Sequence, residues 1–192
     1  GIVFLNMGGS AFQTIEAFMQ NDLVHIALIN EALPRFWSVA HHFSLVVFLH
    51  GTTMAVAKPS HVRGARPYLA FDPSSSDPAW VGWGLLSFSL RDRANSSINV
   101  ATFHLDHEYA KQSDEIGWAS TFRSIFDAIR SSPSLPSPDV LGGDFNQASS
   151  AVRDFLYREQ WTLDFFRPEQ SRVISSRDWN LDCMLAAFHN PS

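Results

Sequence analysis

The sequence has a single cysteine, Cys183, and no long hydrophobic run. One cysteine excludes an internal disulfide bond and favours a reducing intracellular compartment. No apolar segment approaches the roughly 20 residues that a membrane-spanning helix needs, and no secretory signal is visible. We therefore expect a soluble protein without a membrane span.

Positive charge is also scarce. The chain has 14 Lys and Arg against 19 Asp and Glu, for a net charge of -5 with histidine neutral. The basic residues are scattered rather than clustered. Because proteins that grip long DNA neutralise its phosphates with a basic surface, this composition argues against tight, sequence-independent DNA binding. A small phosphate ester as substrate, or a weak nuclease with one basic face, is still compatible.

Apolar residues are abundant by contrast. Hydrophobic residues make up 45% of the 192 positions and charged residues 17%, with 16 phenylalanines. A chain of this length and composition can bury a sizeable core. We expect a single domain over residues 1–192 with an aromatic-rich core.

Short apolar runs separated by turns outnumber helical patterns along the chain. Helical spacing predicts helices over 11–20, 110–131 and 149–158, and loops are expected at 33–43, 58–66 and 72–83. This balance indicates a sheet-rich α+β domain. The expected strands are 2–6, 24–30, 45–49, 52–57, 68–71, 84–90, 98–103, 172–175 and 181–187, with one more apolar strand that ends at the Gly-Gly pair 142–143.

The most informative segment is 139–147, Asp-Val-Leu-Gly-Gly-Asp-Phe-Asn-Gln. An apolar strand leads into a Gly-Gly pair, for which we predict a tight turn. Asp144 and Asn146 follow two residues apart, so in extended chain they face the same side. A carboxylate beside a carboxamide suits a phosphate next to a divalent cation. The structural alternative is a βα loop in which Asn146 or Ser149 caps a helix.

Polar residues also mark the ends of other apolar strands, at Asn6, Glu31 and His104. Each has a structural interpretation, as a turn residue or as an exposed or packed strand end. Asp182 lies inside an apolar strand, where a carboxylate is costly without a partner.

The run Gly143-Asp144-Phe145-Asn146 closely resembles a signature of the endonuclease/exonuclease/phosphatase (deoxyribonuclease I-like) superfamily. Four other segments resemble that superfamily in the same order, and they are spread over nearly the whole chain: Val3–Asn6, Val24–Glu31, Asn99–Leu105 and Asn180–Leu185. The resemblance implies a four-layer α/β/β/α sandwich of two mainly antiparallel sheets. It also implies an active site at one end of the sandwich.

The same resemblance implies a Mg²⁺- or Mn²⁺-dependent phosphoesterase, a nuclease or a phosphatase, that hydrolyses a phosphodiester or phosphomonoester. Glu31 would bind the metal, and Asn6 would hold its water shell or the phosphate. Asp144 would position or deprotonate the attacking water. Asn146 and His104 would contact the phosphoryl group, and Asp182 would orient a second histidine.

One departure opens an alternative. The superfamily's Ser-Asp-His motif does not follow Asp182, and His189 is the only later histidine, with neighbours that do not match. The last strand would then be missing, which leaves a sheet edge that a protein partner could cover. A superfamily arginine is also absent near 80–83. These features support the alternative of a catalytically impaired pseudoenzyme that serves as a scaffold or subunit of a larger complex. The presence of Asn6, Glu31, His104, Asp144 and Asn146 argues for the phosphoesterase instead. An unrelated α+β binding domain is the third interpretation.

Overall fold

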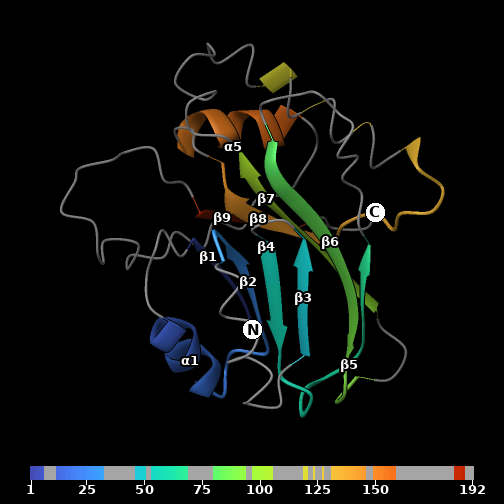
Figure 1. Cartoon of the computed structure of the whole chain (residues 1–192). Coiled ribbons are helices and arrows are strands. Elements are labelled where there is room, and N and C mark those ends of the chain that lie inside the picture. Colours follow the sequence, from blue (N-terminus) through green and yellow to red (C-terminus); the bar gives the residue numbers. More distant parts are fainter. Residues whose placement is uncertain are drawn as a thin grey trace.

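The computed structural model describes residues 1–6, 12–32, 46–50, 53–68, 80–93, 97–105, 119–120, 123, 127, 131–145, 149–158 and 184–188. Their strands form two sheets (Figure 1). Sheet A has the order β1-β2-β4-β3, from β1 (Ile2–Asn6), β2 (Ile26–Asn30), β3 (Val46–His50) and β4 (Thr53–Ala57). Sheet B runs in chain order, from β5 (Val62–Tyr68), β6 (Trp80–Leu90), β7 (Ser97–Leu105), β8 (Val140–Asp144) and β9 (Met184–Phe188).

The core lies in two layers because side chains alternate along each strand. The even-numbered residues Ile26 and Leu28 of β2 pack toward sheet B, where they share a cluster with Val100 and Val140. The odd-numbered residues of β2 pack on the opposite face, against helix α1 (Phe12–Gln20). Sheet A is thus covered on both faces, which explains its continuous apolar runs.

Two helices form the outer layers of the described part of the chain. Helix α1 buries Ile15 and Met19 against sheet A. Helix α5 (Ser149–Arg158) begins soon after β8, buries Phe155 and Leu156, and lies on the other side of the molecule from α1 (Figure 1). The predicted α/β/β/α sandwich is confirmed. Within the described ranges, no helix is long and apolar enough to cross a membrane.

Each sheet is antiparallel apart from one parallel pair, and these two pairs set up the site. In sheet A, β1 pairs parallel with β2, and their last residues, Asn6 and Asn30, stand side by side. In sheet B, β7 pairs parallel with β8, with His104 opposite Asp144. Because parallel strands end at the same sheet edge, each pair delivers two polar residues to one place.

The structure corrects three local predictions. Strand β5 occupies 62–68, where we predicted a loop followed by a strand at 68–71. Its exposed Arg63 and Arg66 flank a register shift on an edge strand, which hides the alternation expected of a strand. Strand β6 begins at Trp80, inside the predicted loop 72–83. The Gly-Gly pair lies within β8 rather than in a turn.

Other predictions fall largely or wholly outside the described residues. Of the predicted helix at 110–131, the residues described, 119, 120, 123, 127 and 131, are helical. The predicted strand at 172–175 lies outside the described ranges, as do Asn146, Asp182 and His189.

Candidate active site

The surface between the sheets changes from apolar to polar toward one end. Along β7 the inward-facing series runs Val100, Thr102, His104, and along β2 it runs Ile26, Leu28, Asn30. The same face carries Asn6, Thr53 and Asp144 at the ends of β1, β4 and β8. Five strands of two sheets therefore contribute polar side chains to one end of the sandwich.

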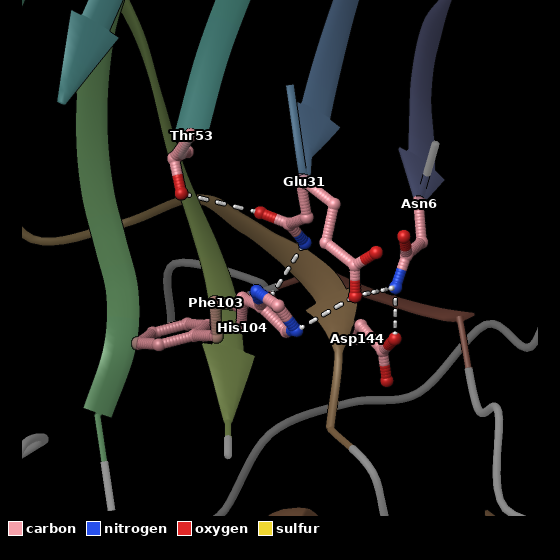
Figure 2. Close-up of polar contacts among 7 residues, drawn as sticks. Asn6, Glu31, Thr53, Phe103, His104 and Asp144 are labelled. Atoms are coloured by element: carbon pink, nitrogen blue, oxygen red, sulfur yellow. Dashed lines mark hydrogen bonds and ion pairs between the residues drawn. The ribbon is translucent and has the colours of Figure 1, made fainter. Parts of the chain in front are cut away.

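Four polar side chains at this end, those of Asn6, Glu31, His104 and Asp144, contact one another across the sheets (Figure 2). The Asn6 amide Nδ2 donates to Asp144 Oδ2 at 2.5 Å and to Glu31 Oε1 at 3.3 Å. His104 Nε2 lies 3.4 Å from the same Glu31 oxygen. Asn6 and Glu31 come from sheet A, and His104 and Asp144 come from sheet B. The cluster joins residues up to 138 positions apart in the sequence.

Glu31 reaches this cluster through an unusual backbone conformation. It has φ of 54°, and no other described non-glycine residue has a positive φ. By strand alternation, Glu31 would point away from sheet B, as Ile29 does toward α1. The left-handed conformation, which costs a non-glycine residue roughly 1–2 kcal/mol, ends this alternation where β2 ends. A strained residue whose carboxylate contacts Asn6 and His104 indicates a functional position.

Gly143 places Asp144 beside His104. Its φ is 134°, and a Cβ atom there would lie 2.1 Å from the backbone oxygen of Phe103. Only glycine permits this close approach of β8 to β7. The following Asp144 is only 2% exposed, so its carboxylate is held in a buried position.

A second polar contact joins the sheets directly behind the cluster. Asn30 is fully buried, and its Nδ2 donates to the backbone oxygen of Phe103 at 2.9 Å. Its Oδ1 accepts from Thr53 Oγ1 at 3.4 Å. Asn30 precedes Glu31, and Phe103 precedes His104, so this contact lies one residue from the cluster on both strands.

Two buried polar atoms at this end have no partner among the described residues, Thr102 Oγ1 and His104 Nδ1. His104 is 5% exposed. An unpaired buried polar group costs roughly 1–3 kcal/mol, so a purely structural role explains these two poorly.

The donor set fits a hard divalent cation that keeps most of its water. Mg²⁺ prefers one or two carboxylates plus waters, and Glu31 and Asp144 supply two carboxylates around one amide. The Glu31 side chain is 40% exposed, so a hydrated ion can reach it. Within the described residues, no three His, Cys, Asp or Glu side chains converge into a metal-binding group.

The sequence predictions for the site have two outcomes. The structure brings Asn6, Glu31, His104 and Asp144 together, while Asn146 and Asp182 lie outside the described residues. Asn30 and Thr53 were missed. The signal was present, because each follows or precedes an apolar alternation on the inward face, Ile26-Leu28-Asn30 in β2 and Thr53-Ala55-Ala57 in β4.

No protein-family model and no curated protein matches this sequence. Solved structures do. D. rerio TDP2 in complex with a single-strand DNA product has a TM-score of 0.58 at 12% identity, over 100% of this chain and 85% of that one. A form of D. rerio TDP2 humanized by 14 mutations has a TM-score of 0.53 at 14% identity, over 80% of this chain and 64% of that one.

Two further structures are similar. The endonuclease domain of TRAS1, a telomere-specific non-LTR retrotransposon, has a TM-score of 0.56 at 10% identity, over 97% of this chain and 84% of that one. ANGEL2, a 2',3'-cyclic phosphatase in complex with adenosine-2',3'-vanadate, has a TM-score of 0.50 at 15% identity, over 88% of this chain and 54% of that one. At such low identity the likeness establishes the fold. This chain has the DNase I-like fold of the endonuclease/exonuclease/phosphatase superfamily. Its Gly-Asp-Phe-Asn run resembles a sequence signature of the same superfamily.

Proposed function

We propose that this protein is a divalent-metal-dependent phosphoesterase that hydrolyses a phosphodiester. The observation that carries the proposal is the convergence of Asn6, Glu31, His104 and Asp144 from four strands at one end of the sandwich. Two carboxylates, an amide and an imidazole are the groups that phosphate hydrolysis needs for charge neutralisation, proton transfer and orientation.

Glu31 and Asn6 would hold Mg²⁺ or Mn²⁺. When bound, such an ion neutralises charge on the phosphoryl oxygens and stabilises the leaving oxygen. The left-handed backbone of Glu31 and its contact with Asn6 favour this role, because they fix the carboxylate at an accessible position.

Asp144 would orient the attacking water and accept its proton. Its burial and its hydrogen bond from Asn6 Nδ2 hold one carboxylate oxygen in place, which preorganises the acceptor. His104 would donate from Nε2 to a phosphoryl oxygen, because that nitrogen faces the cluster. We assign Asn146 to phosphate binding and Asp182 to orientation of a further group, on the sequence resemblance alone.

Nucleic acid is the substrate class that the neighbours favour. One similar structure contains a single-strand DNA product, and another is an endonuclease domain. A third is a cyclic phosphatase holding an adenosine-derived vanadate. The net charge of -5 favours a short or single-stranded substrate over long duplex DNA.

One observation favours a second candidate, a scaffold without activity. Asn6 hydrogen-bonds both carboxylates, and within the described ranges no metal-binding group of three or more His, Cys, Asp or Glu is found. Such a cluster could serve only as a lock between the sheets, that is, as a set of hydrogen bonds that holds the two sheets together. A catalytically impaired subunit of a larger complex would need no more.

The test is metal-dependent hydrolysis of single-stranded DNA, plasmid DNA and bis(p-nitrophenyl) phosphate. Wild type is compared with Glu31→Ala and Asp144→Ala in Mg²⁺, in Mn²⁺ and in EDTA. We expect each substitution to lower turnover by about 10²–10⁴-fold, as for loss of a proton-transfer or charge-stabilising group.

The matched control is Asp154→Ala, which removes an exposed carboxylate on α5 rather than one of the buried or strand-end carboxylates of the cluster. It should retain wild-type turnover. Turnover that survives in Glu31→Ala and Asp144→Ala would reject the assignment. A folded wild type without metal-dependent turnover on any of the three substrates would favour the scaffold.

A further inference from the structure

Asn30 is a fully buried side chain that the proposed reaction does not use. It belongs to β2 of sheet A but hydrogen-bonds the backbone of β7 in sheet B. Toward the middle of the sandwich, the contact between the sheets is made by apolar side chains such as Leu28 and Val100. A polar residue here needs a reason, because an apolar residue of similar volume would fill the space without the cost of burying an amide.

The position of this hydrogen bond supplies the reason. Asn30 is bonded through its peptide to Glu31, and Phe103 through its peptide to His104. The 2.9 Å contact from Asn30 Nδ2 to Phe103 O therefore joins the same two strands as the 3.4 Å contact between Glu31 and His104, one residue earlier. A shift of either sheet would change both contacts together.

The oxygen that Asn30 contacts is confined from another side as well. The Phe103 carbonyl oxygen lies where a Cβ on residue 143 would clash with it, at 2.1 Å. Gly143 in turn precedes Asp144. One carbonyl oxygen is thus packed between the strand that delivers Glu31 and the strand that delivers Asp144.

Thr53 completes the arrangement. Its hydroxyl lies 3.4 Å from Asn30 Oδ1, on the side of the amide opposite the donor nitrogen. With both ends of the amide engaged, Nδ2 is directed at Phe103 O and the amide cannot turn over without losing two contacts. Thr53 is itself buried, so water competes little for this hydroxyl.

We propose that Asn30 is a positioning residue for the active site, held by Thr53, which sets the spacing between Glu31 on one sheet and His104 and Asp144 on the other. The proposal rests on the proposed phosphoesterase function. Asn30 touches neither substrate nor metal. It also supports the left-handed conformation of Glu31 by fixing the residue before it.

Kinetics of Asn30→Leu provide the first test, because leucine keeps the volume and removes the amide. We expect kcat to fall by about 10–100-fold, the range for partners that orient ligating groups, with KM changed by less than about 3-fold. Thr53→Val should lower kcat in the same direction but less, and Thr53→Ser, which keeps the hydroxyl, should restore it. The core control Val100→Ala should lower the stability of the fold and leave kcat unchanged.

A double-mutant cycle separates positioning from general destabilisation. If Asn30 acts through the site, Asn30→Leu should lower kcat by less in a His104→Ala background than in the wild type, because one of the groups it positions is already gone. An equal loss of kcat in both backgrounds would overturn the proposal. So would a Thr53→Ser variant as impaired as Thr53→Val.

A readout that does not need activity keeps this test distinct from the test of function. The Asn6 side-chain amide reports the contacts to Glu31 and Asp144, and its NMR signals can be followed in the absence of substrate. These signals should shift in Thr53→Val and Asn30→Leu but not in Val100→Ala or Thr53→Ser. Unchanged signals in the first two variants would overturn the proposal, whether or not the wild type hydrolyses any substrate.

Discussion

The two ends of the sandwich use polar residues in opposite ways. At the site end, Asn30, His104 and Asp144 are buried between the sheets. Asn30 contacts the Phe103 backbone, His104 contacts Glu31 and Asp144 contacts Asn6, each across the two sheets. At the other end, the buried Lys58 donates from Nζ to the backbone oxygen of Asn21 at 2.6 Å. Lys58 follows β4 of sheet A and Asn21 follows α1, so this contact does not join the two sheets. The same strands run through both ends of the sandwich. The difference therefore shows at which end the fold buries polar groups between the sheets, at a cost in stability.

The histidines make the same contrast. His104 is buried beside the Glu31 carboxylate. His25 is only partly buried, and its ring stacks on His61 with centroids 4.7 Å apart. Burial, followed by positive charge from the Gly1 amino group, His61 and Lys58, lowers the pKa of His25, against the opposing effect of Asp92. His104 at the site end therefore lies beside a carboxylate, whereas the charged groups around His25 at the other end are mainly cationic.

The largest effect should come from the glycine that brings β8 against β7. Gly143→Ala should lower the free energy of unfolding by at least about 3 kcal/mol, because conformational strain is joined by a clash with the Phe103 backbone. Gly64→Ala is the matched control, since φ is 61° there with open space around the added Cβ, and should cost about 1–2 kcal/mol. Urea unfolding of both variants measures the difference. Equal costs would contradict the close approach at the site end.

The second largest effect should come from adding a carboxylate at the site end, which should lower stability there but not at the other end. Asn6→Asp replaces the amide that donates to Glu31 and Asp144 with a third carboxylate, and should destabilise the fold by about 1–3 kcal/mol in EDTA. Mg²⁺ should recover part of this loss, because binding to the native state stabilises it. Thermal unfolding with and without Mg²⁺ provides the measurement.

The control for that charge is Asn21→Asp. Asn21 is exposed, and its Oδ1 accepts from the Leu23 backbone N–H at 2.9 Å, a role that aspartate keeps. This variant should match the wild type in both conditions. If Asn6→Asp behaved in the same way, Asn6 would not lie between two carboxylates.

The smallest effect concerns neighbouring inward-facing positions on β7. Thr102→Val removes a buried hydroxyl without a partner in the described structure, and should stabilise the fold by about 1 kcal/mol. Val100→Thr puts a hydroxyl into the apolar cluster and should destabilise it by about 1–3 kcal/mol. Denaturant midpoints of the two variants should move in opposite directions. If both midpoints moved in the same direction, the change from apolar to polar surroundings along β7 would not lie between positions 100 and 102.

Much of this fold could be predicted from the sequence, because the apolar runs are long enough to define strands. β1, β2, β3, β4 and β7 were placed within two residues of the ends observed. β5 was missed because an edge strand with exposed Arg63 and Arg66 carries no apolar alternation. The first residues of β6 were missed for a similar reason, because Gly82 and Gly84 interrupt the alternation of side chains there.

The site was predictable only in part, for a physical reason. Asn6, Glu31, His104 and Asp144 each stand at a strand end, which marks them in the sequence. Their mutual contacts depend on how the two sheets stack, which local pattern does not specify. The left-handed conformation of Glu31 and the contact of Asn30 with the Phe103 backbone are visible only in the three-dimensional structure.

Titration calorimetry with Mg²⁺ or Mn²⁺ tests the central claim most directly, that the polar end of the sandwich is built around a cation. Wild type and the surface control Asp154→Asn should bind an ion with the same affinity, and Glu31→Gln should bind at least about 10-fold more weakly. If the wild type binds neither ion, or if Glu31→Gln binds as tightly as the control, the polar cluster is a lock between the sheets rather than a metal-dependent site.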